Sequence, residues 1–368
     1  MKTLLLLIGC LVIYLVGKRM LEKQAVASGE PWSKRDRRIA AKLGLQPLAH
    51  IDAKAPAPAD AAFTAARKAV RAGDWAAGAA FVEGAGRDWS KRADRITWLA
   101  DQAVKDDTWL QAWREARPND PTAAAVHAEA LVHLAWEIRG DRLASQTSRE
   151  QFATFHRVLD EAREACTRAQ DLAGDDPAPF INELPVAMGL GYPHARVEAL
   201  WAEIEKRDPY HLGAHTAALQ YWCEKWCGSN ELMHDFARRA AEKGVPGQLL
   251  TTLPLHAFFE AMPQGRFKDP QRYYKRREVL AAADAALADV TAAAAVLDPH
   301  DPRIREARHM LAWTLYWQSR YTEALEQFRE VDGYAGCVPW LYMERPAESY
   351  ASTRDYVAAR ARRRGGRG

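Results

Sequence analysis

The fold of this 368-residue chain is constrained most by the Asp-Pro dipeptides at positions 120–121, 176–177, 208–209 and 301–302. At the start of a helix, an aspartate side chain accepts hydrogen bonds from free backbone amides, and proline fits the first turn because its missing N–H is not needed there. Each dipeptide therefore predicts the start of a helix. The stretches between them are rich in alanine, a strong helix former and weak strand former, and none alternates convincingly between polar and apolar residues. We predict an all-α fold.

The predicted helices follow one another along most of the chain. Their spans are 60–72, 75–84, 90–104, 107–116, 121–139, 148–172, 177–188, 193–206, 210–225, 229–243, 248–263, 270–297, 302–317, 320–331 and 345–362. We therefore expect about 14–15 helices. Hydrophobic residues make up 48% of the chain and charged residues 27%, which is the mixture of a folded protein.

The clearest helical pair lies at 307–331, and its residues follow a recognisable order. They are Leu311, Ala312, Leu315, Ser319, Tyr321, Ala324, Phe328 and Val331. This order resembles the tetratricopeptide (TPR) pattern, in which a small residue on the first helix packs against an aromatic and a small residue on the second. The resemblance implies that the helices approach closely at Ala312 and Ala324, with Tyr321 and Phe328 between them. Ser319 replaces the usual turn glycine.

A weaker copy of this pattern lies near the start of the helical region. Its residues are Ala65, Ala66, Ala69, Gly73, Trp75, Gly78 and Phe81 or Val82, with Gly73-Asp74-Trp75 as the turn. Asp208 follows Asp176 by 32 residues, close to the roughly 34-residue TPR period, whereas the other intervals between neighbouring members of these four dipeptides are longer. Because a single repeat cannot bury its apolar face, repeats must stack. We predict an irregular TPR-like solenoid over residues 60–345.

A block at 219–237 carries a second resemblance. Its residues are Leu219, Gln220, Tyr221, Trp222, Lys225, Trp226, Cys227, Gly228, Ser229, Glu231, Met233, Phe236 and Ala237. The block is similar to one shared by bacterial TPR-like proteins that carry a domain of unknown function. The resemblance therefore implies a fold and little chemistry. Those proteins usually have a glycine where this chain has Cys227, which argues against a metal-ligand role for that cysteine.

An uncharged apolar run, Leu4 to Gly17, lies between Lys2 and Lys18-Arg19. Over about 15 residues it would span about 22 Å as a helix, somewhat less than a bilayer core of about 30 Å. Flanking basic side chains can reach the interface and the bilayer can thin, so one short transmembrane helix fits. We predict a retained single-pass anchor at residues 1–19.

Two alternatives to a retained anchor stay open at this point. Leu7-Ile8-Gly9-Cys10 resembles a lipobox, and Ala25-Val26-Ala27 resembles a signal-peptidase site, although charged residues separate the latter from the apolar run. More basic residues follow the run than precede it; those that follow are Lys18, Arg19, Lys23, Lys34, Arg35, Arg37 and Arg38. The positive-inside rule then places the helical region in the cytoplasm, at the cell membrane.

The chain is thereby expected to have four parts. The anchor at 1–19 is followed at 20–59 by a basic juxtamembrane segment and an extended Ala/Pro linker, since proline disfavours helix at and before its position. The TPR-like domain occupies 60–345. Residues 346–368 form a last helix and a basic tail, disordered from Arg360 onwards, for which we expect contact with anionic lipid through Arg362, Arg363, Arg364 and Arg367.

Two groups of side chains could carry metal or acid–base chemistry. His211 and His215 are four residues apart, as are Cys223 and Cys227 further along the same predicted helix, but the two pairs are out of register by about 80° at 100° per residue. In the second group, His127 and His133 flank Glu129 on the helix 121–139. We expect structural roles for both groups, hence no catalytic residues, no metal and no cofactor, with His211 and His215 as the weak metal candidates.

The thirteen tryptophans include three pairs with a spacing of four residues, at 109/113, 222/226 and 313/317. Each pair lies on one helical face, and we expect most of them in the core. Exposed aromatic residues would be partner anchors, and our partner-binding candidates are Trp222, Trp226, Glu231 and Met233.

The leading hypothesis is a non-enzymatic, membrane-tethered helical-repeat scaffold that binds a protein or peptide. The alternative is a metal-dependent hydrolase using either His211, His215 and Cys223 or His127 and Glu129. A net charge of +3 gives no reason to expect a nucleic-acid partner.

Overall fold

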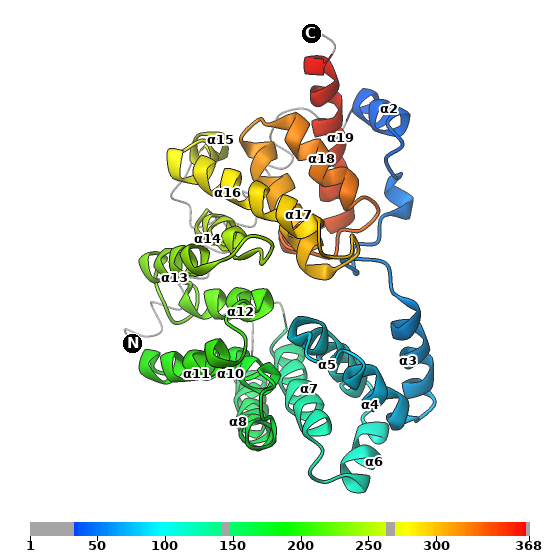
Figure 1. The fold of residues 1–368 in the computed structure, drawn as a ribbon, viewed down its shortest axis with the longest axis vertical. Helices are drawn as coiled ribbons and strands as arrows, with labels where there is room; N and C mark the ends of the chain where they lie inside the picture. The colour runs from blue at the N-terminus through cyan, green and yellow to red at the C-terminus, as the bar shows by residue number, and fades with distance from the viewer. Residues whose placement is uncertain (1–32, 141–147, 263–268, 366–368) are drawn as a thin grey trace. The chain divides into compact units, whose positions relative to one another are not determined.

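The computed structural model describes residues 33–140, 148–262 and 269–365, and these ranges are folded into helices joined by turns and loops (Figure 1). Within these ranges no strand forms, and one isolated bridge joins Asp52 and Tyr334. The prediction of an all-α fold is confirmed. The chain divides into two compact units: residues 59–233, here called the middle unit, and residues up to 58 together with those from 234 onwards, here called the terminal unit.

The predicted anchor at residues 1–19 lies outside the described residues and stays a prediction. Among the helices of the described residues, none is both long enough and apolar enough to cross a membrane.

The middle unit consists of successive helices and their connections. They are α3 (Ala61–Arg71), α4 (Trp75–Glu83), α5 (Trp89–Ala103), α6 (Thr108–Ala116), α7 (Pro121–Arg139), α8 (Arg149–Leu172), α9 (Ala178–Ile181), α10 (Glu183–Leu190), α11 (His194–Arg207) and α12 (Leu212–Trp222). The division between the units falls within α13 (Asn230–Lys243).

The terminal unit is built from both ends of the described chain. Its elements are α2 (Lys34–Lys42), η1 (Leu48–His50), η3 (Leu250–Thr252), α14 (Leu253–Ala261), α15 (Pro270–Tyr274), α16 (Arg277–Ala294), α17 (Pro302–Trp317), α18 (Tyr321–Glu330), η4 (Trp340–Tyr342) and α19 (Pro346–Gly365).

Aspartate caps begin many of these helices, as the sequence predicted. Asp120 accepts hydrogen bonds from the amides of Thr122 and Ala123 at the start of α7, and Asp301 accepts one from Arg303 at the start of α17. Asp208 is an exception. The helix that follows it begins four residues later, at Leu212, because the His211 side chain caps the helix in its place.

The two predicted TPR-like pairs are both helical hairpins. In the pair α17–α18, Ala312, Ala324 and Phe328 are fully buried, and Ser319 has a φ of +63° at the turn, in the left-handed region that glycine usually occupies. In the pair α3–α4, Gly73 has a φ of +86°, and a Cβ at Gly78 would meet the Val70 side chain at 3.1 Å. Gly78 thus lies at a close approach of α3 and α4, and the small residues predicted at the contact of α17 and α18 are buried.

Two predicted helices are broken. The predicted helix 177–188 divides into α9 and α10 because Pro185 has no N–H to donate to the carbonyl of Ile181, four residues earlier. The predicted helix 270–297 divides into α15 and α16 at Arg276, whose backbone is extended. Just before this break the consecutive Tyr273 and Tyr274 are both buried, and their hydroxyls bond to Phe258 and Trp313 respectively.

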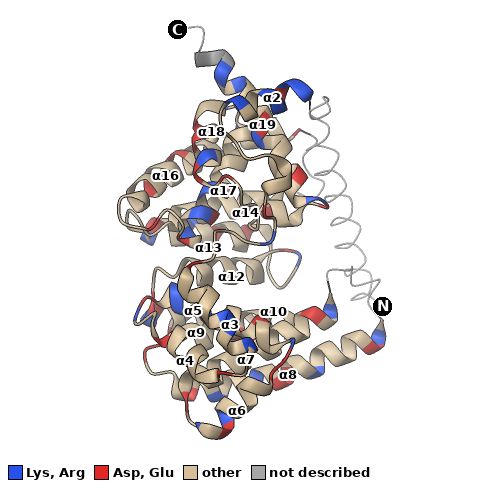
Figure 2. Ribbon diagram, turned by 90° about the vertical axis from the view of Figure 1, so that its right-hand side faces the viewer, with Lys and Arg blue, Asp and Glu red and all other residues tan. Residues whose placement is uncertain are grey.

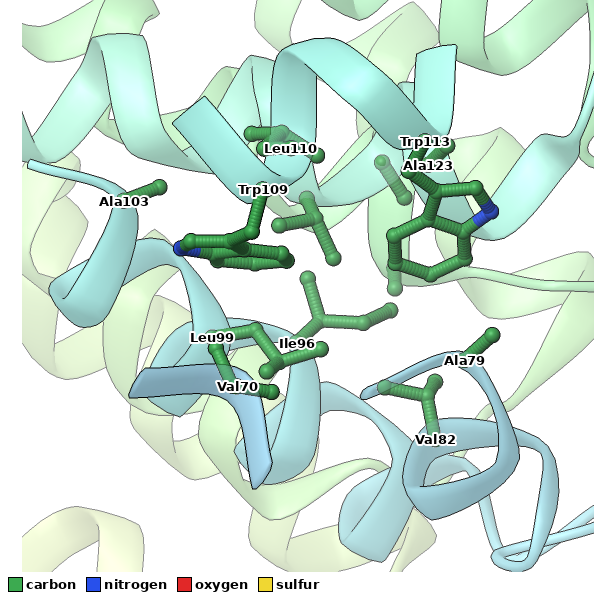
Figure 3. Close-up of a cluster of buried hydrophobic side chains, with 13 residues drawn as sticks. Val70, Ala79, Val82, Ile96, Leu99, Ala103, Trp109, Leu110, Trp113 and Ala123 are labelled. Atoms are coloured by element: carbon green, nitrogen blue, oxygen red, sulfur yellow. The ribbon is translucent and has the colours of Figure 1, made fainter. Parts of the chain in front are cut away.

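The core of the middle unit gathers under α3 to α7 (Figure 3). Ile96 and Leu99 of α5 lie between Val70 and the α6 side chains, and both are fully buried. Trp113 is also fully buried, and Trp75 stacks on it with ring centroids 5.9 Å apart. This aromatic and aliphatic packing holds α6 and the start of α7 in place.

The segment before residue 60 differs from the predicted juxtamembrane linker. Residues 34–42 form the helix α2, which Ser33 caps through a 3.0 Å hydrogen bond from the amide of Asp36, and α2 packs on α19. The sequence indicated no helix here because charged residues dominate the segment and only a narrow side, including Asp36 and Ala40, is buried.

The residues after α2 pair with the segment that follows α18. The backbone hydrogen bonds are those from Asp52 N to the Gly333 oxygen (2.9 Å), from Ala335 N to the Asp52 oxygen (2.7 Å) and from Gly336 N to the Ala55 oxygen (3.1 Å). The Ala/Pro stretch is non-helical, as predicted, but its partner lies some 280 residues away, a pairing that no local pattern reveals.

Replacing Gly336 by alanine is expected to lower the free energy of unfolding by about 1–3 kcal/mol. A Cβ at this position would lie 2.5 Å from the backbone carbon of Ala55, so the paired segment would have to move away. Chemical denaturation followed by circular dichroism measures the loss. Gly213→Ala is the control, since its Cβ would meet nothing closer than 3.4 Å; equal stability of the two variants would contradict the expectation.

Candidate functional site

A cleft of about 390 Å³ opens in the middle unit between α6, α7 and α8. Its lining residues are Arg114, Arg117, Pro118, Asp120, Ala123, Ala124, His127, Leu131, Glu161, Glu164, Ala165 and Arg168. Small side chains (Ala123, Ala124 and Ala165) come from α7 and α8, which allows an occupant to approach the helix backbones. Charged side chains make up much of the remaining lining.

The loop between α6 and α7 forms one wall of this cleft, and its conformation is set by Asp120. One carboxylate oxygen caps α7, while the other accepts a 3.1 Å hydrogen bond from the indole of buried Trp113. The Arg117 guanidinium lies over the Trp75 ring, 5.2 Å from its centroid, and 3.6 Å from the Asp120 carboxylate. The loop is thus attached to the core at both of its ends.

A second hollow, of about 420 Å³, lies at the same loop. It is lined by Glu83, Arg117, Pro118, Asn119, Asp120, Pro121 and Thr122. Arg117, Pro118 and Asp120 therefore line both hollows, and the loop presents polar groups to each of them.

The charges in the cleft are of both signs. The Arg168 guanidinium donates to the Asn119 side chain at 2.6 Å, and Glu161 accepts from Arg157 at 2.6 Å. Arg114 is exposed, and within the described part of the chain no carboxylate lies at ion-pair distance from it. The cleft can thus offer a cation to an acidic group while Glu164 offers a carboxylate to a basic one.

His127 also lines the cleft and is uncharged at neutral pH. Burial of the ring and the nearby positive charge of Arg114 lower the pKa of His127 to about 4. A neutral imidazole has one donor and one acceptor nitrogen, a combination that suits the amide groups of a peptide.

The hydrolase alternative would need His127 and Glu129 to act together, but Glu129 contacts other residues instead. These residues are two positions apart on α7, and Glu129 turns towards α5, where its carboxylate accepts a hydrogen bond from the Thr97 hydroxyl at 3.3 Å. Its other contact is the Nε2 of His133 at 3.1 Å, while the Nδ1 of His133 reaches Asp101 at 2.8 Å. Glu129 and His133 therefore link α5 and α7, and His127 takes no part in this link.

His133 is positively charged at neutral pH. Burial favours the neutral ring, but the hydrogen bonds to Asp101 and Glu129 and their negative charges outweigh it and raise the pKa of His133 to about 10. Both ring nitrogens then donate to carboxylates. Glu129 and His133 were singled out from the sequence, but Asp101 was not. The contact of Asp101 with His133 depends on how α5 packs against α7, which no local pattern shows.

His211 and His215 are both buried and serve the start of α12. His211 Nδ1 accepts a hydrogen bond from the Ala214 amide at 3.1 Å, and His215 Nδ1 lies 3.0 Å from the His211 carbonyl oxygen. Cys223 donates instead to the Leu219 carbonyl oxygen and to the sulfur of Met233. Among the described residues, no three His, Cys, Asp or Glu side chains are placed to hold a metal ion.

The partner-binding candidates fall into two classes. Trp222 is 8% exposed and Met233 only 1%, so neither is available to a partner and we withdraw both. Helical spacing could not show this, because the chain turns sharply after Trp222: a Cβ at Gly228 would lie 2.0 Å from the Trp222 oxygen. Glu231 is exposed, and Trp226 is half-buried.

Trp226 packs edge to face on Trp136, with ring centroids 5.4 Å apart, and the Arg139 guanidinium lies near both rings. Trp226 and Glu231 stay partner-binding predictions. The other tryptophans of the three spaced pairs, Trp109, Trp113, Trp313 and Trp317, are buried as expected.

The basic tail begins later than predicted. We expected disorder from Arg360 onwards, whereas α19 continues to Gly365. Arg360 packs over the Tyr356 ring, and Arg362 is exposed on the helix. The side chains of Arg363 and Arg364, and the whole of Arg367, lie outside the described part of the chain, so their lipid contacts stay predictions.

Comparison with known proteins adds no function to this geometry. No protein-family model matches the chain, and no curated protein matches it.

Proposed function

We propose that this chain is a TPR-like helical-repeat scaffold, tethered to a membrane by its N-terminal apolar segment, that binds a protein or peptide partner in the cleft between α6, α7 and α8. The observation that carries the proposal is the lining of this cleft, which combines alanine-lined helix faces with Arg114, neutral His127 and Glu164. Peptide backbones and charged side chains are the ligands that such groups recognise.

The helical hairpins support the repeat part of the proposal. Buried small residues stand where α3 meets α4 and where α17 meets α18, as in TPR repeats. The apolar run from Leu4 to Gly17 and the basic residues after it support the tether and a cytoplasmic location for the helical region. Attachment of the cleft-forming loop to Trp113 and Trp75 supports binding to a preformed surface, which costs little ordering on association.

Arg114→Glu and Ala124→Arg are each expected to reduce partner capture about tenfold or more. The first reverses the charge of Arg114, which no carboxylate of the described residues pairs with, and the second fills the cleft from the half-buried side of α7. The measurement is in-cell crosslinking followed by affinity capture of the C-terminally tagged, full-length protein from solubilised membranes, with partners identified by mass spectrometry.

Lys68→Glu is the matched control, because Lys68 is an exposed helical cation of the same unit that does not line the cleft. It should capture the same partners as the unmodified protein. Full capture by both cleft variants would refute the proposed binding site, and helical circular dichroism of each variant shows whether the fold is intact.

A further inference from the structure

The helix α2 carries a cationic face that points away from the protein. Lys34, Arg38 and Lys42 are spaced by four residues and share one side of the helix, with Arg35 beside them. All four are exposed. Within the described residues, no carboxylate pairs with any of the four.

The opposite side of α2 is held against α19. Asp36 and Ala40 are the buried residues of the helix, and the Asp36 carboxylate lies 3.9 Å from the guanidinium of Arg360. The acidic residue of α2 is therefore turned inward and paired. This orientation leaves the cations, and not the carboxylate, on the outer surface.

The end of α19 extends the same surface. Figure 2 shows the basic residues of α2 and of the C-terminal end of α19 in the same region of the terminal unit, and the two helices are in contact. Arg362 at this end is exposed. We call the set Lys34, Arg35, Arg38, Lys42 and Arg362 the α2–α19 basic surface.

The chain keeps this surface near the N-terminal apolar run. Residues 18–33 separate Gly17 from Lys34, and 16 residues reach at most about 55 Å when fully extended. Three of these connecting residues, Lys18, Arg19 and Lys23, are themselves basic. A surface that is cationic, folded and confined to this distance from a membrane-inserted segment is complementary to anionic lipid headgroups.

We propose that the α2–α19 basic surface docks on the anionic lipid headgroups of the membrane that holds the N-terminal segment. The docking site is a folded helix face, in addition to the basic residues at the very end of the chain. The inference rests on the membrane tether of the proposed function and not on partner binding in the cleft.

The test uses full-length protein reconstituted into vesicles of phosphatidylcholine, with or without phosphatidylglycerol. Amide hydrogen exchange of residues 33–45, followed by mass spectrometry, is expected to be about threefold slower or more in the anionic vesicles, and raised salt should remove the difference. This difference in exchange should disappear in the α2 triple variant, Lys34→Gln/Arg38→Gln/Lys42→Gln. The control variant, Arg67→Gln/Lys68→Gln/Lys105→Gln, removes the same charge from exposed positions of the middle unit and should leave the difference unchanged.

Equal exchange in the two kinds of vesicle, for protein that resists extraction by carbonate, would overturn this inference and leave the tether standing. Protein that carbonate extracts would refute the tether itself. Protection by added RNA that exceeds protection by lipid at the same ionic strength would also overturn it, in favour of a nucleic-acid partner. Partner capture by the α2 triple variant should be normal, which separates this surface from the cleft.

Discussion

Replacing Arg354 by methionine is expected to lower the free energy of unfolding by about 3–5 kcal/mol. Arg354 is only 2% exposed, and its guanidinium donates to Asp332 at 2.6 Å and to Asp355 at 2.8 Å. Methionine has a similar length but removes the guanidinium that donates to both carboxylates. Removing one partner of a buried ionic group is costly because the remaining charge loses its compensation and stays out of water.

The effect should spread to the segment before residue 60. Asp332 also accepts a hydrogen bond from the Gln46 amide at 2.7 Å, so a carboxylate that moves out of place no longer holds this segment. Chemical denaturation measures the loss of stability, and faster hydrogen exchange of residues 46–55 shows its location. Arg345→Met is the control, because its ion pair with Glu348 is largely exposed and should contribute less than about 1 kcal/mol. A denaturation midpoint for Arg354→Met as high as that of the control would disprove this account.

The second large effect is expected at His133. Replacing it by leucine should lower the free energy of unfolding by about 2–4 kcal/mol at neutral pH, because the Glu129 carboxylate, which is 12% exposed, then keeps only the Thr97 hydroxyl as a partner. Glu129→Leu/His133→Leu should recover much of this loss, since an apolar pair has no uncompensated charge. A double variant less stable than His133→Leu would argue against the electrostatic explanation.

The His133 contribution should also depend on pH. Its pKa is raised from the usual histidine value of 6.5 to about 10 in the folded protein, so folding favours the protonated ring. The stabilisation is therefore complete below about pH 6.5 and is lost as the pH rises towards 10. The difference in unfolding free energy between the unmodified protein and His133→Leu should shrink over this interval. A constant difference from pH 6 to 10 would mean that folding does not change the pKa of His133, and it would contradict this prediction.

Local sequence chemistry was a reliable guide to where many helices begin. Asp120 and Asp301 cap their helices because capping involves only a side chain and amides two or three residues away. The same logic failed at Asp208, where His211 caps the helix instead. The choice between two nearby caps depends on which of them the surrounding packing buries, and His211 is 4% exposed.

The candidate site was only partly predictable. His127 was singled out for its type and does line the cleft, but the hydrolase alternative joined it with Glu129, which instead contacts His133. Arg114 and Arg168 were not singled out, because they belong to α6 and α8 and line one cleft only where these helices pack around α7. An arginine on an exposed helix face carries no signal of its own in a single sequence.

Helical content, the hairpins at 61–83 and 302–330, and the capping aspartates follow from short-range propensity, spacing and hydrogen bonding, and these could be read from the chain alone. The pairing of residues 46–55 with 332–336, the Asp101–His133–Glu129 link and the burial of Trp222 and Met233 could not. Each of these depends on which surfaces meet between segments distant in sequence or beyond a sharp turn. Whether such contacts form depends on the burial and charge balance of the whole unit, and a local sequence pattern cannot predict them.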